Sequence, residues 1–144
     1  MTTLHKTFGI AARNFTAYPE MPDALALTEY GVKMEELGFD SIWVWDHILL
    51  GVDPNFPIVD SLTLLTAIAA RTTRIKLSTG ILVLPLRNPV LLAKQLATMD
   101  QLSRGRLLMA MAVGWYKREF DAVGIPFEQR GRIMDENLEI LKRF

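Results

Sequence analysis

The sequence has 144 residues, half of them hydrophobic, and its 16 basic side chains balance 16 acidic ones. It is long enough to bury the core of one domain, and its zero net charge removes the electrostatic case for binding nucleic acid or an anionic membrane surface. The absence of cysteine excludes disulfides, thiolate catalysis and cysteine-based metal sites.

Neither a membrane segment nor a targeting segment is expected. The longest charge-free stretches are about half of the ~20 residues that a membrane-spanning helix needs. The first stretch, Met1–Arg13, lacks the basic-then-apolar order of a signal peptide. We therefore expect a cytoplasmic protein.

The first half of the chain contains two predicted strand–helix units. Phe8–Ala12 is a short apolar strand, and the following helix is expected to start near Pro22 and to stop at Gly38. Ser41–Trp45 is the second strand, and Asp60 is expected to cap the helix after it. The apolar faces of these helices hold Leu27, Tyr30, Met34 and Leu37 in the first and Leu62, Leu65 and Ile68 in the second.

The second half repeats the pattern. Arg74–Thr79 is the third strand, continued by an apolar but irregular segment over Gly80–Leu86, and Asn88 is the expected N-cap of the next helix. The uninterrupted apolar run Leu107–Val113 predicts a fourth strand covered on both faces, followed by a loop and by a helix from Arg130. Apolar residues at helical spacing are Leu92, Leu96 and Met99 in the third helix and Met134, Leu138 and Leu141 in the last.

The four strands begin at intervals of about 33 residues, which predicts a parallel α/β sheet. An open doubly wound sheet and part of a (β/α)8 barrel both fit, and a complete barrel takes ~250 residues. Neither of the glycine-rich phosphate motifs, GxGxxG or GxxxxGK followed by Ser or Thr, follows a strand. Their absence weakens a nucleotide-binding open sheet without deciding between the two architectures.

Three segments at the predicted strand ends carry a family resemblance: Asp46-His47, Ser78–Leu107 and Ala112–Glu136. They resemble the luciferase-like flavin-dependent oxidoreductases, most closely the branch that uses the deazaflavin coenzyme F420. The resemblance implies a (β/α)8 TIM barrel that binds a flavin-type ring at the carboxyl ends of its strands. It covers only the amino-terminal half of a typical family member, so residues 1–144 are expected to form a single domain with the first four β/α units.

The resemblance places His47 where it faces the central ring of the cofactor. An imidazole there titrates near neutrality and can donate or accept the proton that accompanies hydride transfer. Asp46 is implied to bind the cofactor or to orient its loop. The competing interpretations are a hydrogen-bonded rim residue for His47 and a polar strand cap for Asp46.

Gly80 and Ile81 match the place where family members often carry a non-prolyl cis peptide, which forms a rigid bulge behind the flat ring. Ile81 would be the apolar support, although Gly80 alone also explains a tight strand exit. Gly114 and Trp115 match the segment that lines the ring pocket after the fourth strand. A packing role for Trp115 is the alternative.

The remaining charged residues are expected to be structural. This applies to Arg87, and also to Glu119 and Arg130–Arg132, which should hold the last loop to the barrel by charge pairing. Metal binding has no support, because His5 and His47 are far apart and no HExxH motif or carboxylate cluster occurs.

The leading interpretation is an oxidoreductase that transfers hydride between coenzyme F420 and a small organic substrate. FMN with oxygen would instead make it a monooxygenase. A non-catalytic truncated half-barrel that dimerises is a further alternative. An unrelated barrel that binds a phosphorylated metabolite is less favoured, because the usual phosphate site is built from strands seven and eight.

Half a barrel would leave the first and fourth strands as unpaired edges. The inner strand faces, with Ile42, Val44, Leu77, Leu107 and Met109 as candidates, would also lose the opposite wall of their core. Two copies that pair first strand against fourth would rebuild an eight-stranded barrel. The sequence therefore predicts a homo-oligomer that acts on a small-molecule substrate and binds neither nucleic acid nor membrane.

Overall fold

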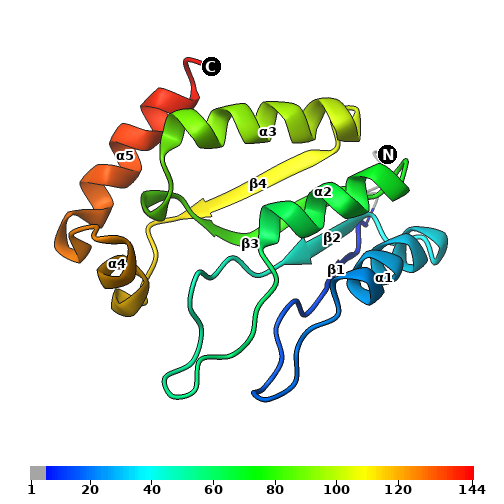
Figure 1. Cartoon of the computed structure of the whole chain (residues 1–144). Coiled ribbons are helices and arrows are strands. Elements are labelled where there is room, and N and C mark those ends of the chain that lie inside the picture. The colour runs from blue at the N-terminus through cyan, green and yellow to red at the C-terminus, as the bar shows by residue number, and fades with distance from the viewer. Residues whose placement is uncertain (1–5) are drawn as a thin grey trace.

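The computed structural model describes residues 6–144 and shows parallel strands that alternate with helices (Figure 1). His5, considered above as a metal ligand, lies outside the described residues, as does the start of the Met1–Arg13 stretch. The strands are β1 (Gly9–Ala11), β2 (Ser41–Val44), β3 (Lys76–Val83) and β4 (Leu107–Ala112). The helices are α1 (Ala24–Glu36), α2 (Ser61–Arg71), α3 (Pro89–Ser103), α4 (Lys117–Val123) and α5 (Arg130–Leu141), with 3-10 turns η1 (Leu84–Leu86) and η2 (Phe127–Gln129).

Each strand pairs in parallel with the next one along the chain, so the sheet has the order β1-β2-β3-β4. Helices α1, α2 and α3 cover the same face of this sheet (Figure 1). A doubly wound sheet would instead reverse its strand order at a switch point and carry helices on both faces. The observed order and the one-sided helices are those of a (β/α)8 barrel, and they exclude the open sheet.

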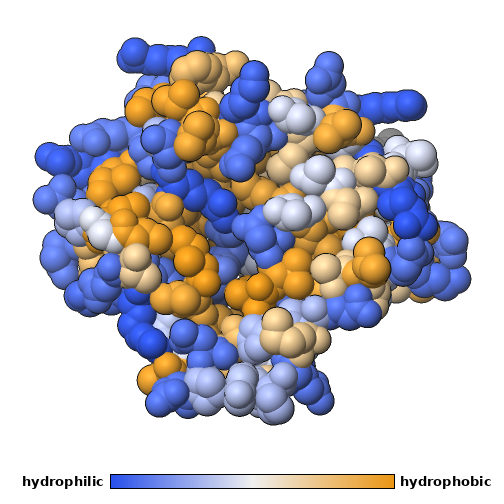
Figure 2. All heavy atoms as spheres, viewed as in Figure 1, coloured by the Kyte–Doolittle hydropathy of each residue, from blue (hydrophilic) through white to orange (hydrophobic). Residues whose placement is uncertain are grey.

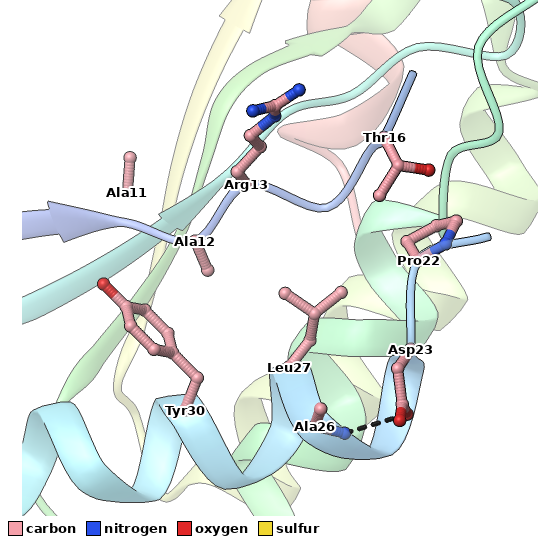
Figure 3. A pocket seen from close by; sticks show the side chains of 9 residues that line it. All are labelled: Ala11, Ala12, Arg13, Thr16, Pro22, Asp23, Ala26, Leu27 and Tyr30. Carbon is pink, nitrogen blue, oxygen red and sulfur yellow. Dashed lines mark hydrogen bonds between the residues drawn. The ribbon is translucent and has the colours of Figure 1, made fainter. Parts of the chain in front are cut away.

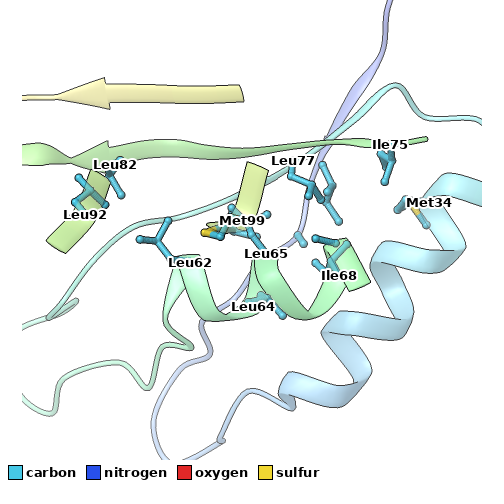
Figure 4. Close-up of a cluster of buried hydrophobic side chains, with 14 of the residues drawn as sticks. Met34, Leu62, Leu64, Leu65, Ile68, Ile75, Leu77, Leu82, Leu92 and Met99 are labelled. Atoms are coloured by element: carbon cyan, nitrogen blue, oxygen red, sulfur yellow. The ribbon is translucent and has the colours of Figure 1, made fainter. Parts of the chain in front are cut away.

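The hydrophobic core lies between the sheet and the helices, with α2 at its centre (Figure 4). Leu65 and Ile68 of α2 and Leu77 of β3 have no exposed surface. Burying one such side chain contributes about 1.5–3 kcal/mol, so this layer is the main source of stability in the fold. Other members of the cluster are Met34, Ile42, Val44, Leu62, Leu82, Leu92 and Met99.

The predicted inner faces of the strands are wrong. Ile42, Val44 and Leu77 are fully buried in the cluster beneath the helices, so they do not face the barrel interior. Leu107 and Met109 pack against the same cluster. An uninterrupted apolar run does not reveal which residues face the helices, because alternation is the signal that separates the two faces of a strand.

The face of the sheet away from the helices carries a mixed set of side chains. Trp43, Ser78 and Leu108 are register partners there on β2, β3 and β4. Trp43 Nε1 donates a 2.8 Å hydrogen bond to Ser41 Oγ, and a Cβ on Gly9 would lie 2.7 Å from both atoms. Leu108 is 41% exposed, so within residues 6–144 the prediction that β4 is covered on both faces is wrong.

Helix-capping residues follow the sequence pattern. Asp60 and Asn88 are the N-caps of α2 and α3, as predicted, and their side chains accept backbone N–H groups of the first turn. Gly38 follows the end of α1 with a φ of +90°, a conformation that favours glycine. Local chemistry therefore sets these helix boundaries.

Other local predictions are wrong. Helix α1 does not start at Pro22, because Asp23 is its N-cap, and Leu37 is 61% exposed and does not join the buried face. Strand β3 extends to Val83 and does not end at Thr79, but its register with β4 shifts between Thr79 and Leu82, so the predicted irregularity after Thr79 is present. Helix α4 occupies part of the predicted loop after β4, since a seven-residue helix is too short to show a clear hydrophobic period.

Two charged side chains hold the turn between α2 and β3 at the amino-terminal ends of the strands. Arg106 is 9% exposed and donates to three backbone carbonyl oxygens within residues 69–75, at 2.8–2.9 Å. Glu35 accepts from the three backbone N–H groups of residues 73–75. These contacts stabilise the end of the sheet opposite to the one where barrels bind their ligands.

The helix-covered side of the molecule has a mixed surface. Figure 2 shows apolar side chains gathered toward the middle of this view and hydrophilic side chains around its rim. In the part of the chain that the structure describes, no helix combines the length and apolar character that a bilayer crossing requires.

Two helical glycines give a matched test of the packing between α1 and α2. A Cβ on Gly31 would lie 2.7 Å from Ile68 Cγ2, whereas a Cβ on Gly131 of α5 would meet nothing within 4 Å. We expect Gly31→Ala to lower the free energy of unfolding by about 1–3 kcal/mol through overpacking. Gly131→Ala should leave it unchanged or raise it by up to about 1 kcal/mol. Urea unfolding of both variants checks this, and a stabilised Gly31→Ala protein would contradict the packing.

Candidate functional site

The carboxyl ends of β3 and β4 and the residues that follow β2 and β4 line an open cavity of about 500 Å³. The residues predicted for the site all line it: Asp46, His47, Gly80, Ile81, Gly114 and Trp115. The rest of the wall is apolar and consists of Trp45, Val83, Ala112 and Val113. Small-molecule sites are typically concave, ~300–1,000 Å³ in volume and mostly apolar, so we take this cavity as the candidate site.

A second cavity, of about 450 Å³, lies between the end of β1 and α1 (Figure 3). Its wall includes Asp23, whose carboxylate already accepts the N–H groups of Leu25 and Ala26 as the cap of α1. Arg13, also in the wall, lies with its guanidinium 5.0 Å from the ring centroid of Phe15. The charged groups of this cavity therefore have local partners, and the predicted site residues do not line it.

Asp46 follows β2 and joins three other elements. It is 6% exposed, and its Oδ2 accepts a 2.9 Å hydrogen bond from the N–H of Val83 at the end of β3. Its Oδ1 accepts hydrogen bonds of 2.6 Å from Ser61 Oγ at the start of α2 and from the guanidinium of Arg87. The structure thus gives Asp46 and Arg87 a bracing role, and cofactor binding by Asp46 stays a prediction.

Asn14 braces the ends of β1 and β2 in the same way. This side chain is fully buried, and its Nδ2 donates to the carbonyl oxygens of Trp45 at 2.9 Å and Val59 at 2.7 Å. Its Oδ1 accepts from the N–H of Trp45 at 3.0 Å. No role is predicted for Asn14 from sequence, because a single asparagine in a polar loop carries no signal of long-range partners.

His47 is held by Glu119 of α4, which lies 72 residues further along the chain. The Nδ1 atom is 3.2 Å from both carboxylate oxygens of Glu119, which is 1% exposed. Glu119 Oε1 also accepts the N–H groups of Ile48 at 2.6 Å and Leu49 at 3.3 Å. Glu119 therefore does hold a loop, but through backbone N–H groups, and it also contacts the candidate catalytic imidazole. Sequence reasoning missed this contact.

The environment of His47 favours its protonated form. The hydrogen bond to Glu119 raises the pKa of His47 above the ordinary value of 6.5, and the negative charges of Glu119 and Asp46 add to this rise, while burial opposes it. Because the folded-state pKa is the higher one, the pairing stabilises the fold fully below about 6.5 and is lost as pH rises through the folded-state pKa.

The ends of β3 and β4 shape the opposite wall. Their register shifts between Thr79 and Leu82, and the Gly80–Ile81 peptide bond within this irregularity is cis. Ile81 is 46% exposed and lines the cavity. Gly114 has a φ of +78°, and a Cβ there would lie 2.6 Å from Val83 Cγ1, so only glycine fits at this position.

Trp115 stands beside His47 and is 71% exposed. The two rings are nearly perpendicular, with centroids 6.3 Å apart, and the indole also lies 5.2 Å from the ring of Tyr116. An aromatic side chain this exposed is not part of the described core, so the packing interpretation of Trp115 is wrong within residues 6–144. Its face is available to a ligand.

The predicted charge pairing of Arg130–Arg132 with the barrel is wrong. Arg130 lies with its guanidinium 3.9 Å from the ring centroid of Phe127 and donates to the carbonyl of the same residue. Arg132 lies 3.5 Å from Glu136 on its own helix. Across residues 6–144, no three potential metal ligands come together.

The assembled cavity suits a flat, largely apolar ring with one titratable neighbour. Trp45, Ile81 and Trp115 provide apolar and aromatic surface, and His47 provides the titratable group. Since Nδ1 of His47 faces Glu119, Nε2 is the ring nitrogen left for a ligand. Such a site can bind a ring and exchange a proton at Nε2.

The chain matches a known protein family. A profile of the family described as luciferase-like monooxygenase matches residues 7–144. The F420-dependent glucose-6-phosphate dehydrogenase of Amycolatopsis mediterranei (strain U-32) is 32% identical over 120 residues, which cover 81% of this chain and 36% of the dehydrogenase. Limonene 1,2-monooxygenase of Rhodococcus erythropolis is 37% identical over 112 residues, which cover 76% of this chain and 28% of the monooxygenase. The chain thus spans about a third of the length of these curated relatives.

A solved structure supports the same grouping. The monooxygenase RslO1 from Streptomyces bottropensis matches with a TM-score of 0.79 and 30% sequence identity, covering 96% of this chain and 42% of that one. The match confirms the predicted α/β fold of the luciferase-like barrel type.

Asp46→Ala tests the brace at the strand ends. The substitution leaves the buried N–H of Val83 and the guanidinium of Arg87 without their acceptor. We expect it to lower the free energy of unfolding by roughly 2–4 kcal/mol. Asp121→Ala is the matched control, because it removes an exposed carboxylate 2.6 Å from Lys117 and should cost less than about 0.5 kcal/mol. Equal effects of the two variants in denaturant unfolding would contradict the bracing role.

Proposed function

Because the chain belongs to the luciferase-like monooxygenase family, we propose that it is part of an oxidoreductase that transfers hydride between coenzyme F420 and a small organic substrate. The observation that carries the proposal is His47, an imidazole paired with a buried carboxylate in the wall of a largely apolar cavity at the strand ends. The F420-dependent dehydrogenase cited above, with 81% of this chain aligned, supports the choice of cofactor.

The residues of the cavity take distinct roles in this proposal. Bound there, a deazaflavin ring supplies two-electron hydride chemistry. Ile81, on β3, and Trp115, after β4, would hold the ring, because both side chains line the cavity. When a substrate C–H bond loses hydride, His47 Nε2 accepts the proton released from the substrate, and in the reverse direction it returns that proton. Asp46 keeps the ends of β2 and β3 in place around the site.

An FMN-dependent monooxygenase is the second candidate function. Limonene 1,2-monooxygenase is 37% identical to this chain, a higher identity than the dehydrogenase shows over a similar length. The same cavity suits either ring, since deazaflavin and FMN share a flat tricyclic core. The relative affinities for the two cofactors therefore distinguish the two functions.

We also propose that residues 1–144 supply the first four β/α units of an eight-unit barrel and that the protein is a homo-oligomer. The sheet order and the coverage of about a third of the curated relatives support the first proposal. The second applies where residues 1–144 act without the other four units, because β1 and β4, the edges of the described sheet, would then pair between two copies.

Competition binding tests the cofactor assignment. With the whole protein, we expect F420 to displace FMN at equal concentration, as followed by fluorescence. Trp115→Ala should weaken the binding of whichever ring occupies this cavity by about three- to tenfold, the range expected for one lost aromatic contact. FMN binding as tight as that of F420 would overturn the deazaflavin assignment and favour the monooxygenase.

Steady-state kinetics tests the role of His47. His47→Ala should lower kcat by about 10²–10⁴-fold, the usual contribution of a general acid or base, while the cofactor Kd changes little. Lys142→Ala is the control: this exposed side chain pairs only with Glu139 in the contacts of the described residues, and the variant should match the wild type. Unchanged turnover in the His47 variant would make His47 a rim residue without a catalytic role.

A further inference from the structure

The contact between His47 and Glu119 decides which ring nitrogen faces the cavity. An ionised carboxylate only accepts hydrogen bonds, so a neutral imidazole beside it must carry its proton on Nδ1. Nδ1 lies at the same 3.2 Å from both oxygens of Glu119, so either oxygen can accept that proton. Nε2 is then unprotonated and has a lone pair.

We propose that Glu119 is the positioning residue that holds neutral His47 in the Nδ1–H tautomer and leaves Nε2 free to accept a proton in the cavity. The catalytic meaning of this arrangement rests on the proposed function, but the arrangement itself does not. A carboxylate placed behind an imidazole also stabilises the positive charge that appears when Nε2 takes a proton.

Glu119 is itself fixed by its surroundings. It is almost completely buried, and Oε1 accepts the N–H groups of Ile48 and Leu49 in the segment that follows His47. The start of α4 is tied to the same loop, since Tyr116 and Arg118 both donate to the carbonyl oxygen of Gly51. Helix α4 and the loop after β2 therefore position the carboxylate and the imidazole together.

The two carboxylates near His47 both favour the protonated form of its ring. Glu119 faces it from α4, and Asp46 precedes it at the end of β2. Both raise the pKa of His47, although the carboxylate of Asp46 is paired with Arg87. The positive form of the imidazole is thus supported mainly by Glu119.

Nitrogen NMR of the wild-type protein gives the first test. With ¹⁵N-labelled histidine, the signals of His47 are assigned by their absence from a His47→Gln variant. At a pH above the folded-state pKa of His47, we expect its neutral ring to carry the proton on Nδ1. A neutral ring with the proton on Nε2, or a pKa at or below 6.5, would overturn the proposal.

Glu119→Gln gives the second test, because it keeps the size of the side chain and removes its charge. Its carbonyl oxygen can still accept from Ile48, so its NH₂ group is left facing Nδ1 as a donor. We expect His47 to switch to the Nε2–H tautomer, its pKa to fall, and kcat to drop by roughly 10²-fold or more with little change in cofactor KM. Glu128→Gln, at an exposed carboxylate in η2, is the control and should change none of these.

The outcomes separate this proposal from the proposed function. A Glu119→Gln protein that loses thermal stability but keeps the Nδ1–H tautomer and the wild-type pKa would show a purely structural role and overturn the proposal. If Glu119→Gln does not fold, the wild-type tautomer still decides. A wild-type protein with the Nδ1–H tautomer but without F420-dependent hydride transfer would overturn the proposed function alone.

Discussion

Loops that leave the carboxyl ends of parallel strands carry backbone groups that must find partners once they are buried, and this requirement shapes the whole site. Buried side chains meet it here. Asn14 binds the backbone of Trp45 and Val59, which both follow β2, Asp46 accepts the N–H of Val83, and Glu119 accepts the N–H groups after His47. Each of these contacts joins segments more than 30 residues apart, so together they hold separate loops in one arrangement.

The two layers of the molecule contribute differently. Leu65, Ile68 and Leu77 exclude water between the helices and the sheet and provide most of the stability. The buried carboxylates add little net free energy of folding, because the cost of removing each charge from water offsets most of the favourable interaction with its partners. Their effect is positional. They fix the directions in which His47 and the end of β3 approach the cavity, which the apolar layer alone does not determine.

The predictable part of the fold is the part that local chemistry sets. The spacing of apolar segments gives the strand–helix alternation, and Asp60 and Asn88 mark helix starts because a short polar side chain there satisfies free N–H groups. The faces of the strands were not predictable, because Ile42 and Val44 lie in continuous apolar segments that do not alternate. The strand order came from the pairing itself, which a one-dimensional pattern does not contain.

The candidate site also has a part that could be predicted from sequence and a part that could not. His47, Gly114 and Trp115 are identified through the family resemblance of the segments that follow predicted strands, and they do line one cavity. The pairing of His47 with Glu119 was not predictable, since no local pattern connects residues 72 positions apart and α4 itself was missed. Asn14 and Asp46 show the same limit: their types suggest caps, but their partners depend on the assembled sheet.

A crystal structure of the whole protein with F420 bound would test the central claim most directly. It should show the deazaflavin ring in the cavity at the ends of β2, β3 and β4, against Ile81, with the imidazole of His47 between the ring and Glu119. A ring bound elsewhere, for example in the cavity between β1 and α1, or an imidazole turned away from Glu119 would contradict this assignment of the site.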